Sequence, residues 1–232
     1  MTANSNPFGD EVAVQGVTRV FLVDDHPIVR EGLAKLIANE PDLDVCGEAD
    51  DVSSALRAFG ESKPDVLVVD LALKTGSGID LIKSVRAEHS ALPVLVLTMH
   101  EEPFYVERTL RAGANGYVTK HEPGENVLIA IRAVVRGEMH VSDRLSPKLL
   151  KRLITGDPDE DEPLISRLSD RELQVFVSIG EGRSTQEIAD DLNLSVKTIE
   201  TYRAHLKTKL DLKDARELVQ YSIRWVLSRG PK

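Results

Sequence analysis

The sequence has one cysteine and few aromatic residues, and it has no long apolar run. Its 232 residues include a single cysteine, Cys46, and 4% aromatic residues. One cysteine cannot form a disulfide within the chain, which excludes a disulfide-stapled domain and suits a reducing compartment. No stretch approaches the ~18 consecutive apolar residues of a membrane span, and the first residues show no signal-peptide pattern. We therefore predict a cytoplasmic protein with no membrane partner.

The charge of the chain is acidic as a whole and unevenly divided. The formal net charge is −9, which by itself argues against broad binding to nucleic acid. Residues 164–232, however, contain 12 Lys and Arg against 10 Asp and Glu, a net of +2, which leaves −11 for residues 1–163. Between them, residues 156–162 read GDPDEDE, a composition typical of a solvated linker. We predict a first domain at residues 18–136, a linker at 137–163 and a second domain at 164–229.

Short β-branched runs alternate with helical patterns in the first domain. The runs are VTRVFLV, LDVCGEA, DVLVVDL, LPVLVLT and NGYVT. The helical patterns cover residues 27–39, 52–62, 78–88, 103–112 and 125–136. Five strands alternating with five helices predict right-handed crossovers and an α/β doubly wound, five-stranded parallel sheet. Such sheets bind ligands at the carboxyl ends of their strands.

Chemically capable side chains stand at those strand ends. Asp24 and Asp25 follow the first run, Asp70 the third, Thr98 ends the fourth, and Lys120 follows the fifth. Crowded carboxylates repel one another unless a cation lies among them, and a hard ion such as Mg²⁺ prefers oxygen ligands. One carboxylate could then act as a nucleophile toward a phosphoryl group.

Each of these residues also has an ordinary structural reading. An Asp after a strand often caps the next helix, a Thr often lies in a turn, and a Lys is commonly a solvated surface residue. The joint placement of these residues at the ends of four strands favours the functional reading.

Residues 18–136 resemble the receiver domain of two-component response regulators, a flavodoxin-like fold. The segments that carry the resemblance are FLVDDHPIVREGL, VLVVDLALKTGSGIDL, VLVLTMHEE and RAGANGYVTK. The resemblance implies that Asp70 is the phosphoacceptor for a sensor histidine kinase. It also implies that Asp24, Asp25, Asp70 and the backbone carbonyl of Ala72 hold Mg²⁺.

The same resemblance assigns roles to three further residues, and at one place this sequence differs from the family pattern. It implies that Thr98 is the switch hydroxyl, Tyr117 the switch aromatic residue and Lys120 the family's lysine. On phosphorylation the hydroxyl and the ring are expected to move together. Many relatives carry Met-Pro where this chain has Leu73-Lys74. The additional cation could change the lifetime of the phosphoryl group or the choice of partner, or the pair could be a tolerated loop substitution.

The second domain is helical throughout. Helices are predicted at residues 170–179, 185–192, 196–210 and 215–228, which gives a small four-helix, all-α domain. Ser169 and Glu172 have the spacing of a capping box, and Ser195 is placed to cap the third helix. The short turn before that helix has the length used in helix-turn-helix units.

The third helix carries candidate DNA contacts. Ile199, Leu206 and Leu210 fall near one face at helical spacing. Cationic and polar side chains spread over the rest, where they could reach phosphates or base edges. The candidate contact residues are Lys197, Thr198, Glu200, Thr201, Arg203, Ala204, Lys207 and Lys209. Alternatively, this is an ordinary amphipathic helix with a solvated basic face.

Residues 164–229 resemble the LuxR-type DNA-binding domain of the NarL/FixJ class of response regulators. The stretch LSDRELQVFVSIGEGRSTQEIADDLNLSVKTIETYRAHLKTKL carries the resemblance. It implies that residues 196–210 form the recognition helix and that the last helix, with Leu218, Tyr221 and Trp225, pairs two copies on DNA. Glu200-Thr201-Tyr202 replaces the usual Lys/Arg-x-His, so the target sequence cannot be inferred from relatives.

Together the two resemblances imply a phosphorylation-controlled transcription factor rather than a metabolic enzyme. The expected partners are a histidine kinase, double-stranded promoter DNA, a second copy of the chain on DNA and, as a further candidate, RNA polymerase. In this class the receiver is expected to obstruct the DNA-binding surface, or to keep the protein monomeric, until it is phosphorylated. Two other functions remain open: a phosphatase, for which Ala72 leaves no general acid, and a regulator that docks other proteins.

Overall fold

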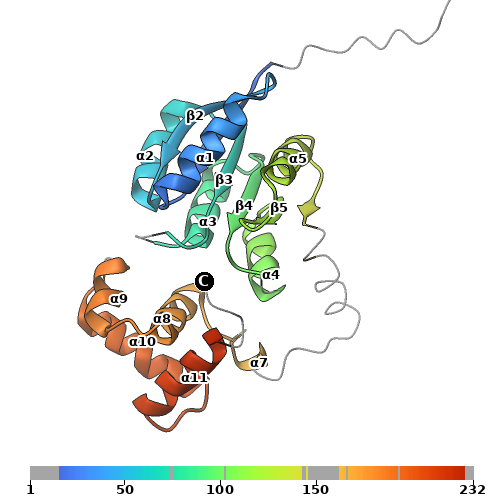
Figure 1. Cartoon of the computed structure of the whole chain (residues 1–232). Helices are drawn as coiled ribbons and strands as arrows, with labels where there is room; N and C mark the ends of the chain where they lie inside the picture. Colours follow the sequence, from blue (N-terminus) through green and yellow to red (C-terminus); the bar gives the residue numbers. More distant parts are fainter. Residues whose placement is uncertain are drawn as a thin grey trace, which may run out of the picture.

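The chain folds into an α/β domain followed by a helical domain (Figure 1). The computed structural model describes residues 16–73, 76–101, 103–142, 145, 162–165, 167–192 and 194–227. Residues 156–161, which make up most of the acidic run in the predicted linker, lie outside the described residues. So does Lys74, which differs from the Met-Pro pattern of many relatives.

The first domain is built on a parallel sheet. Its strands are β1 (Thr18–Val23), β2 (Leu43–Ala49), β3 (Val66–Val69), β4 (Val94–Thr98), β5 (Gly116–Thr119) and β6 (His140–Val141). Their order in the sheet is β2-β1-β3-β4-β5-β6, and every neighbouring pair is parallel. The doubly wound parallel sheet predicted from the alternating runs is therefore confirmed.

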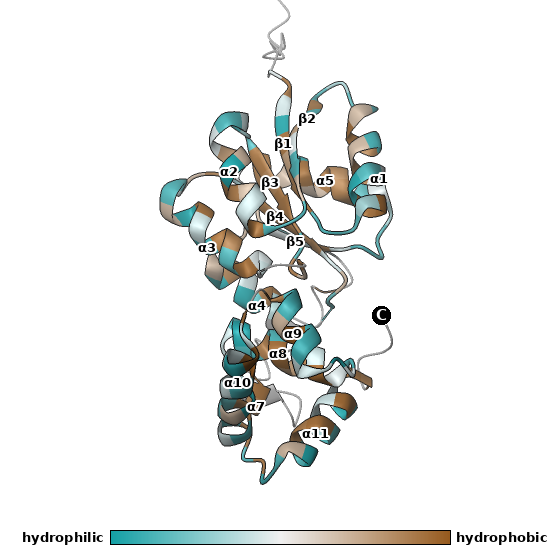
Figure 2. Cartoon of the chain, turned by 90° about the vertical axis from the view of Figure 1, so that its left-hand side faces the viewer, coloured by the Kyte–Doolittle hydropathy of each residue, from teal (hydrophilic) through white to brown (hydrophobic). Residues whose placement is uncertain are grey.

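Helices cover both faces of this sheet (Figure 2). They are α1 (Pro27–Ala38), α2 (Val52–Ser62), α3 (Gly78–Glu88), α4 (Pro103–Ala112) and α5 (Gly124–Val135). Alternate strand residues point to opposite faces, so Leu67 packs in the cluster with α2, α3 and α4, and Val68 in the cluster with α1 and α5. Strands buried on both sides need continuous apolar runs, which explains the five β-branched segments.

The prediction of five strands was one strand short. The sixth strand, β6, contains only two residues and pairs Gly116 with His140 and Tyr117 with Val141 at the edge of the sheet. Two residues, the first of them polar, are too few to show a hydrophobic period. The sequence pattern therefore places this segment in the predicted linker. The chain that leaves the receiver-like domain therefore begins as part of the sheet.

The second domain contains α7 (Glu162–Ile165), α8 (Asp170–Gly180), α9 (Thr185–Asp191), α10 (Val196–Lys209) and α11 (Ala215–Leu227). The four longer helices match the four predicted ones to within a residue at each end, and α7 is additional. Their core centres on Phe176, whose ring lies 5.7 Å from that of Tyr221 and 5.5 Å from that of Trp225, centroid to centroid. Among the residues that the structure describes, no helix has the length and apolar character needed to span a bilayer.

Candidate functional site: an acidic rim and a recognition helix

The predicted acidic site forms at the carboxyl ends of β1 and β3. These strands are neighbours in the sheet, and the backbone N–H of Asp70 donates to the carbonyl of Val23 at 2.8 Å. That pairing places Asp70 beside Asp24, although they lie 46 positions apart in the sequence. Both carboxylates are buried, with Asp70 only 3% exposed. The structure thus brings the carboxylates of Asp24 and Asp70 together, as the parallel order of β1 and β3 predicts.

Lys120, which follows β5, joins the two carboxylates. Its Nζ lies 2.7 Å from Oδ2 of Asp24 and 2.6 Å from Oδ2 of Asp70. Burial raises the pKa of Asp70, and the nearby ammonium offsets only part of that rise. Burial acts to lower the pKa of Lys120, but the two carboxylates outweigh it and the pKa is raised. The alternative of a solvated surface lysine therefore does not apply.

The helix-capping alternative does not apply to the aspartates either. Asp24 Oδ1 accepts from the backbone N–H of His26, but His26 itself is the N-cap of α1 and makes no side-chain capping bond. Asp70 Oδ1 accepts from the N–H of Ala72 at 3.3 Å, while Ser77 caps α3. The carboxylates are thus held in the loops above the sheet and leave the helix starts to other residues.

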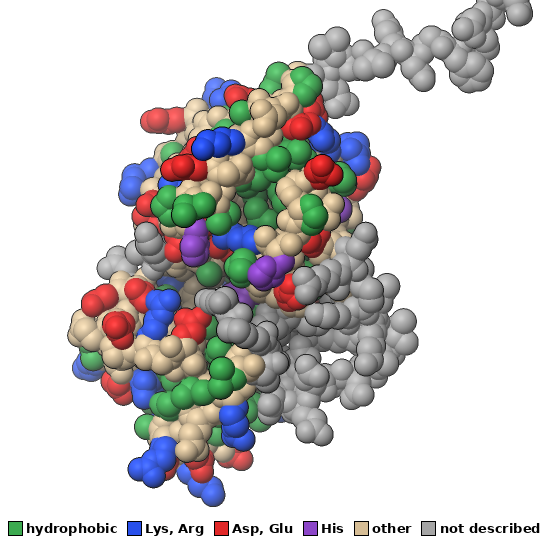
Figure 3. All heavy atoms as spheres, viewed as in Figure 1, with side chains coloured by type: hydrophobic (Ala, Val, Ile, Leu, Met, Phe, Trp, Pro, Cys, Tyr) green, Lys and Arg blue, Asp and Glu red, His purple; other side chains and the backbone are tan. Residues whose placement is uncertain are grey.

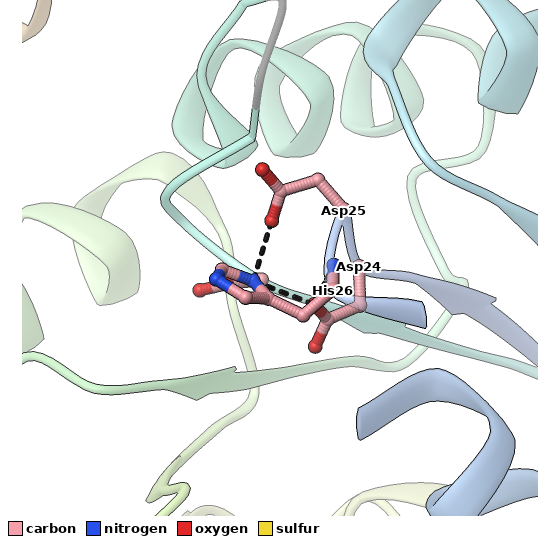
Figure 4. A group of neighbouring side chains, drawn as sticks. Asp24, Asp25 and His26 are labelled. Carbon is pink, nitrogen blue, oxygen red and sulfur yellow. Dashed lines mark hydrogen bonds and ion pairs between the residues drawn. The ribbon is translucent and has the colours of Figure 1, made fainter. Parts of the chain in front are cut away.

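Asp25 and His26 complete one side of the rim (Figure 4). The Nδ1 atom of His26 lies 2.7 Å from Oδ1 of Asp25 and 3.4 Å from Oδ1 of Asp24. Potential ligand atoms of Asp24, Asp25, His26 and Asp70 lie within 4.8 Å of one another. The side chain of His26 is 61% exposed, and this residue directly follows the two aspartates in the sequence.

The predicted switch residues lie inside the domain. Thr98 ends β4 and Tyr117 lies on β5, and both are fully buried. The hydroxyl of Tyr117 donates to the backbone carbonyl of His100 at 3.0 Å. The ring of His100 stacks on that of Tyr105 in α4, with centroids 4.1 Å apart. The loop after Thr98 is therefore tied to β5 on one side and to α4 on the other.

The predicted DNA contacts lie on α10, most of them at the surface. Ile199 and Leu206 are buried, and Leu210, the residue after α10, is buried too. Ser195 caps the helix by accepting from the N–H of Thr198 at 3.1 Å, as the sequence predicts. Among the candidates, Lys197, Glu200, Thr201, Ala204 and Lys209 are exposed, and Thr198, Arg203 and Lys207 are half-buried. The basic side chains do not form a uniform patch in the view of Figure 3, where acidic and basic groups are interspersed over both domains.

Several polar candidates on α10 already have partners within the domain. Glu200 accepts from the Thr185 hydroxyl at 3.2 Å and lies 3.7 Å from Nε of Arg203. The hydroxyl of Thr201 donates to the carbonyl of Lys197 at 3.0 Å. Glu200 therefore links α9 to α10 and also orients Arg203.

Lys209 binds a buried carboxylate that sequence reasoning assigned only to capping. Glu172 closes the capping box of α8 with Ser169 and also lies 2.7 Å from Nζ of Lys209, which joins α8 to the end of α10. Its side chain is 4% exposed. Burial acts to raise the pKa of Glu172, but the bonds from Lys209 and Ser169 outweigh this and the pKa is lowered. The spacing of the capping box gave no sign of this second partner.

Replacing Glu172 by Gln should destabilise the second domain by about 2 kcal/mol near neutral pH, because a charged hydrogen-bonded pair is lost. A carboxyl whose folded pKa is lowered stabilises the fold above its ordinary pKa and loses that effect as the pH falls through the lowered value. The difference from wild type should therefore begin to shrink as the pH falls below the ordinary glutamate pKa of about 4.3, and it should vanish only below the lowered pKa of the folded state. The free energy of unfolding is measured by urea unfolding, followed through the fluorescence of Trp225, which is the single tryptophan of the chain. Exposed Asp190→Asn serves as the control, and a difference that persists in acid would contradict the assignment.

The last helix turns its large apolar residues inward. Leu218, Tyr221 and Trp225 are buried in the core of their own domain. The resemblance assigns pairing of two copies to the helix that contains these residues. Because the three side chains fill the core of their own domain, pairing through α11 would use its other face. Ile223 and Leu227 are the large apolar residues exposed there.

Comparison with known proteins identifies both domains. Residues 20–132 match the family described as response regulator receiver domain, and residues 166–222 match the bacterial regulatory proteins of the luxR family. The oxygen regulatory protein NreC of Staphylococcus haemolyticus is 35% identical over 211 residues, which cover 89% of this chain and 97% of NreC. NreC of Staphylococcus aureus is 35% identical over 210 residues, with the same coverage.

Solved structures agree with this match. The chain is similar to the RcsB response regulator of Salmonella typhimurium, with a TM-score of 0.67, 28% identity, and coverage of 90% of this chain and 98% of that one. RcsB of the same organism bound to promoter DNA with the phosphomimetic BeF3− gives a TM-score of 0.63 and 30% identity, with coverage of 88% and 98%. The chain therefore belongs to the two-component response regulators that join a receiver domain to a LuxR-type DNA-binding domain.

Proposed function

We propose that Asp70 is the aspartate that a sensor histidine kinase phosphorylates in this chain, and that the modification controls binding of α10 to promoter DNA. The observation that carries the proposal is the pairing of buried Asp70 and Asp24 with Lys120 at the carboxyl ends of the strands. A carboxylate in this position can attack a phosphoryl group. The ammonium of Lys120 can then stabilise the charge that develops on the transferred oxygens.

Mg²⁺ fits the acidic rim as the metal of this site. Three carboxylates converge there, and the ligand atoms they offer are hard oxygens. Asp24, Asp25 and Asp70 would hold the ion, together with the backbone carbonyl of Ala72. A bound Mg²⁺ would neutralise charge on the phosphoryl donor.

The buried residues around Asp70 support a switch. The Thr98 hydroxyl, at the end of β4, is placed to donate a hydrogen bond to a phosphoryl oxygen. Tyr117 is linked through its hydroxyl to His100 in the loop that follows Thr98. A shift of this loop toward a phosphoryl group would therefore reach β5 and α4 together.

The second domain supports recognition of double-stranded DNA. An exposed, capped α10 preceded by the short α9 is the arrangement of a helix-turn-helix unit. RcsB has been solved bound to promoter DNA with BeF3− and as two dimers bound to two parallel DNAs. By analogy, two copies of this chain would bind adjacent half-sites. Contact with RNA polymerase and a cytoplasmic location stay predictions, as do the domain limits 18–136 and 164–229.

Phosphorylation with acetyl phosphate and Mg²⁺, followed by mapping of the modified residue, tests the first half of the proposal. We expect wild type and the surface control Asp50→Ala to carry one label at Asp70, and Asp70→Ala to carry none. A label that persists in Asp70→Ala would refute the assignment of the phosphoacceptor.

Selection from a random duplex library, followed by mobility-shift assays, tests the second half. We expect the phosphorylated wild type to bind the selected sequence more tightly than Asp70→Ala does. Lys197→Ala should weaken binding to all sequences about equally and reduce its salt dependence, as the loss of a phosphate contact does. Equal, salt-insensitive DNA retention with and without phosphate would contradict the switch.

A further inference from the structure

The backbone of Asp24 is held from both sides by neighbouring elements. Its N–H donates to the carbonyl of Ala49 at the end of β2, at 3.1 Å. Its carbonyl accepts at 2.6 Å from Nη1 of Arg30, which lies on the first turn of α1. That carbonyl belongs to the planar peptide that joins Asp24 to Asp25. Arg30 therefore fixes the orientation of the peptide between two carboxylates of the acidic rim.

Arg30 is itself held by Glu48. Nε of Arg30 donates to Oε2 of Glu48 on β2 at 3.0 Å, while Nη1 reaches the carbonyl of Asp24. A planar guanidinium can hold two acceptors in a fixed geometry, whereas an ammonium group is a point charge on a flexible stem. The side chain of Arg30 is only 19% exposed. The Arg30–Glu48 pair thus connects β2 to the peptide that carries the rim.

A β-bulge in β2 turns Glu48 toward α1. The register of β2 against β1 shifts by one residue between Val45 and Gly47, so Cys46 is an extra residue in the strand. Val45 packs in the cluster with α1 and α5, and Cys46 in the cluster with α2. Gly47 also lies on the α2 side, where a Cβ would stand 2.5 Å from the ring of Phe21. Strict alternation without the bulge would direct Glu48 toward α2, away from α1.

The Arg30–Glu48 pair acts behind the rim rather than on the metal. Within the part of the chain that the structure describes, the group of potential ligands contains neither residue. Groups that hold the ligands of a metal in place strongly affect the affinity of the site, and replacing one typically weakens metal binding 10- to 100-fold. Carboxylates that converge in the absence of a cation repel one another, so a fixed backbone is needed to keep them together.

We propose that Arg30, anchored by Glu48, is a positioning residue for the metal carboxylates: it fixes the Asp24–Asp25 peptide so that both side chains face the ion before the ion binds. This inference rests on Mg²⁺ as the metal of the rim. The pair acts on the peptide of Asp24 and not on the phosphoacceptor. Its loss therefore weakens metal binding but leaves the maximal rate of phosphorylation unchanged once the metal is saturating.

Substitutions in the full-length chain test both members of the pair. Arg30→Gln removes the guanidinium, Glu48→Ala removes its anchor, and Glu48→Gln keeps an oxygen that can accept from Nε. Lys35→Gln is the matched control, because Lys35 is an exposed cation on the same helix and its loss changes the net charge equally. Circular dichroism establishes that each variant is folded, and Arg30→Lys replaces Arg30→Gln if the latter is not.

Binding of Mn²⁺ measures the affinity of the rim without any phosphoryl donor. Mn²⁺ prefers oxygen ligands as Mg²⁺ does, and the electron paramagnetic resonance signal of the free ion falls as it binds. We expect Arg30→Gln to weaken binding about tenfold and Glu48→Ala to weaken it less. Glu48→Gln and Lys35→Gln should match wild type. The double variant should bind no more weakly than Arg30→Gln alone, because Glu48 acts through Arg30.

The rate of labelling by acetyl phosphate, measured against Mg²⁺ concentration, is the second readout. We expect Arg30→Gln to need about tenfold more Mg²⁺ for its half-maximal rate and to reach the wild-type rate at saturation. A general disturbance of the domain would lower the maximal rate instead.

The proposal is overturned if folded Arg30→Gln binds Mn²⁺ as tightly as wild type, or if Lys35→Gln weakens binding equally, which would trace the effect to net charge. A lower maximal rate with an unchanged dependence on Mg²⁺ also overturns it. Failure of the proposed function gives different results. If wild type binds Mn²⁺ but carries no label at Asp70, the phosphoacceptor assignment fails and the binding data alone decide the role of Arg30. If wild type binds no Mn²⁺, the metal site and this inference fail together.

Discussion

Replacing Lys120 by Met is expected to destabilise the receiver domain by about 3 kcal/mol near neutral pH without divalent ions. Nζ of Lys120 lies 2.7 Å and 2.6 Å from the carboxylates of Asp24 and Asp70, and all three side chains are buried. Removing one member of a buried ion pair leaves its partners as uncompensated buried charges, which costs more than the intact pair contributes. Met fills a similar volume, so the effect reports on charge rather than on packing.

The destabilisation caused by Lys120→Met should depend on pH, and the pKa of Asp70 sets the direction of that dependence. Burial raises the pKa of Asp70 even with Lys120 present, and loss of the ammonium raises it further. A carboxyl whose folded pKa is raised binds its proton more tightly in the folded state, so lowering the pH through that range stabilises the fold. The defect of Lys120→Met should therefore shrink as the pH falls from 7, because the neutral carboxyl costs less to bury.

Urea unfolding of the receiver followed by circular dichroism measures the change, with the exposed Lys35→Met as the control. Added Mg²⁺ should stabilise Lys120→Met more than wild type, since an ion that binds only the folded state stabilises it by mass action. A Lys120→Met variant as stable as wild type at neutral pH, or one that Mg²⁺ does not stabilise, would contradict the role assigned to Lys120.

The rim was predictable from the sequence because parallel topology alone places strand ends together. Once VTRVFLV and DVLVVDL are assigned as neighbouring buried strands, Asp24 and Asp70 must share an edge, whatever lies between them. Helix starts were predictable for a similar local reason: Ser169 and Ser195 cap α8 and α10 through bonds to residues three positions on. Local spacing and strand order carry this information without any knowledge of packing.

Contacts between distant helices were not predictable in this way. The bond of Lys209 to Glu172 and the pairing of Asp170 with Lys83 and Arg108 join residues at least 37 positions apart on helices whose relative orientation no periodic pattern records. Judged from its sequence neighbours alone, each of these residues is explained equally well as a helix cap or as a solvated surface charge. The two-residue strand β6 escaped prediction for the opposite reason, since it is too short to show any period.

Replacing Gly78 by Ala is expected to slow phosphorylation of Asp70 about 100-fold, because a misplacement of roughly 1 Å at a reacting group has an effect of that size. A Cβ on Gly78 would lie 2.1 Å from the carbonyl oxygen of Asp70 and 2.8 Å from Cα of Leu71. Both are backbone atoms, so no rotamer change relieves the contact. The chain must either move the start of α3 or displace Asp70 from Lys120.

The same substitution should reduce stability by about 3 kcal/mol, at the upper end for an overpacked site. Gly60→Ala in α2 is the matched control: a Cβ there meets no atom within 4 Å, and Ala favours helix by up to about 1 kcal/mol. The rate of acetyl phosphate labelling, measured well below the unfolding temperature of each variant, separates displacement of Asp70 from unfolding. Labelling of folded Gly78→Ala at the wild-type rate would show that α3 moves instead and that the position of Asp70 does not depend on this glycine.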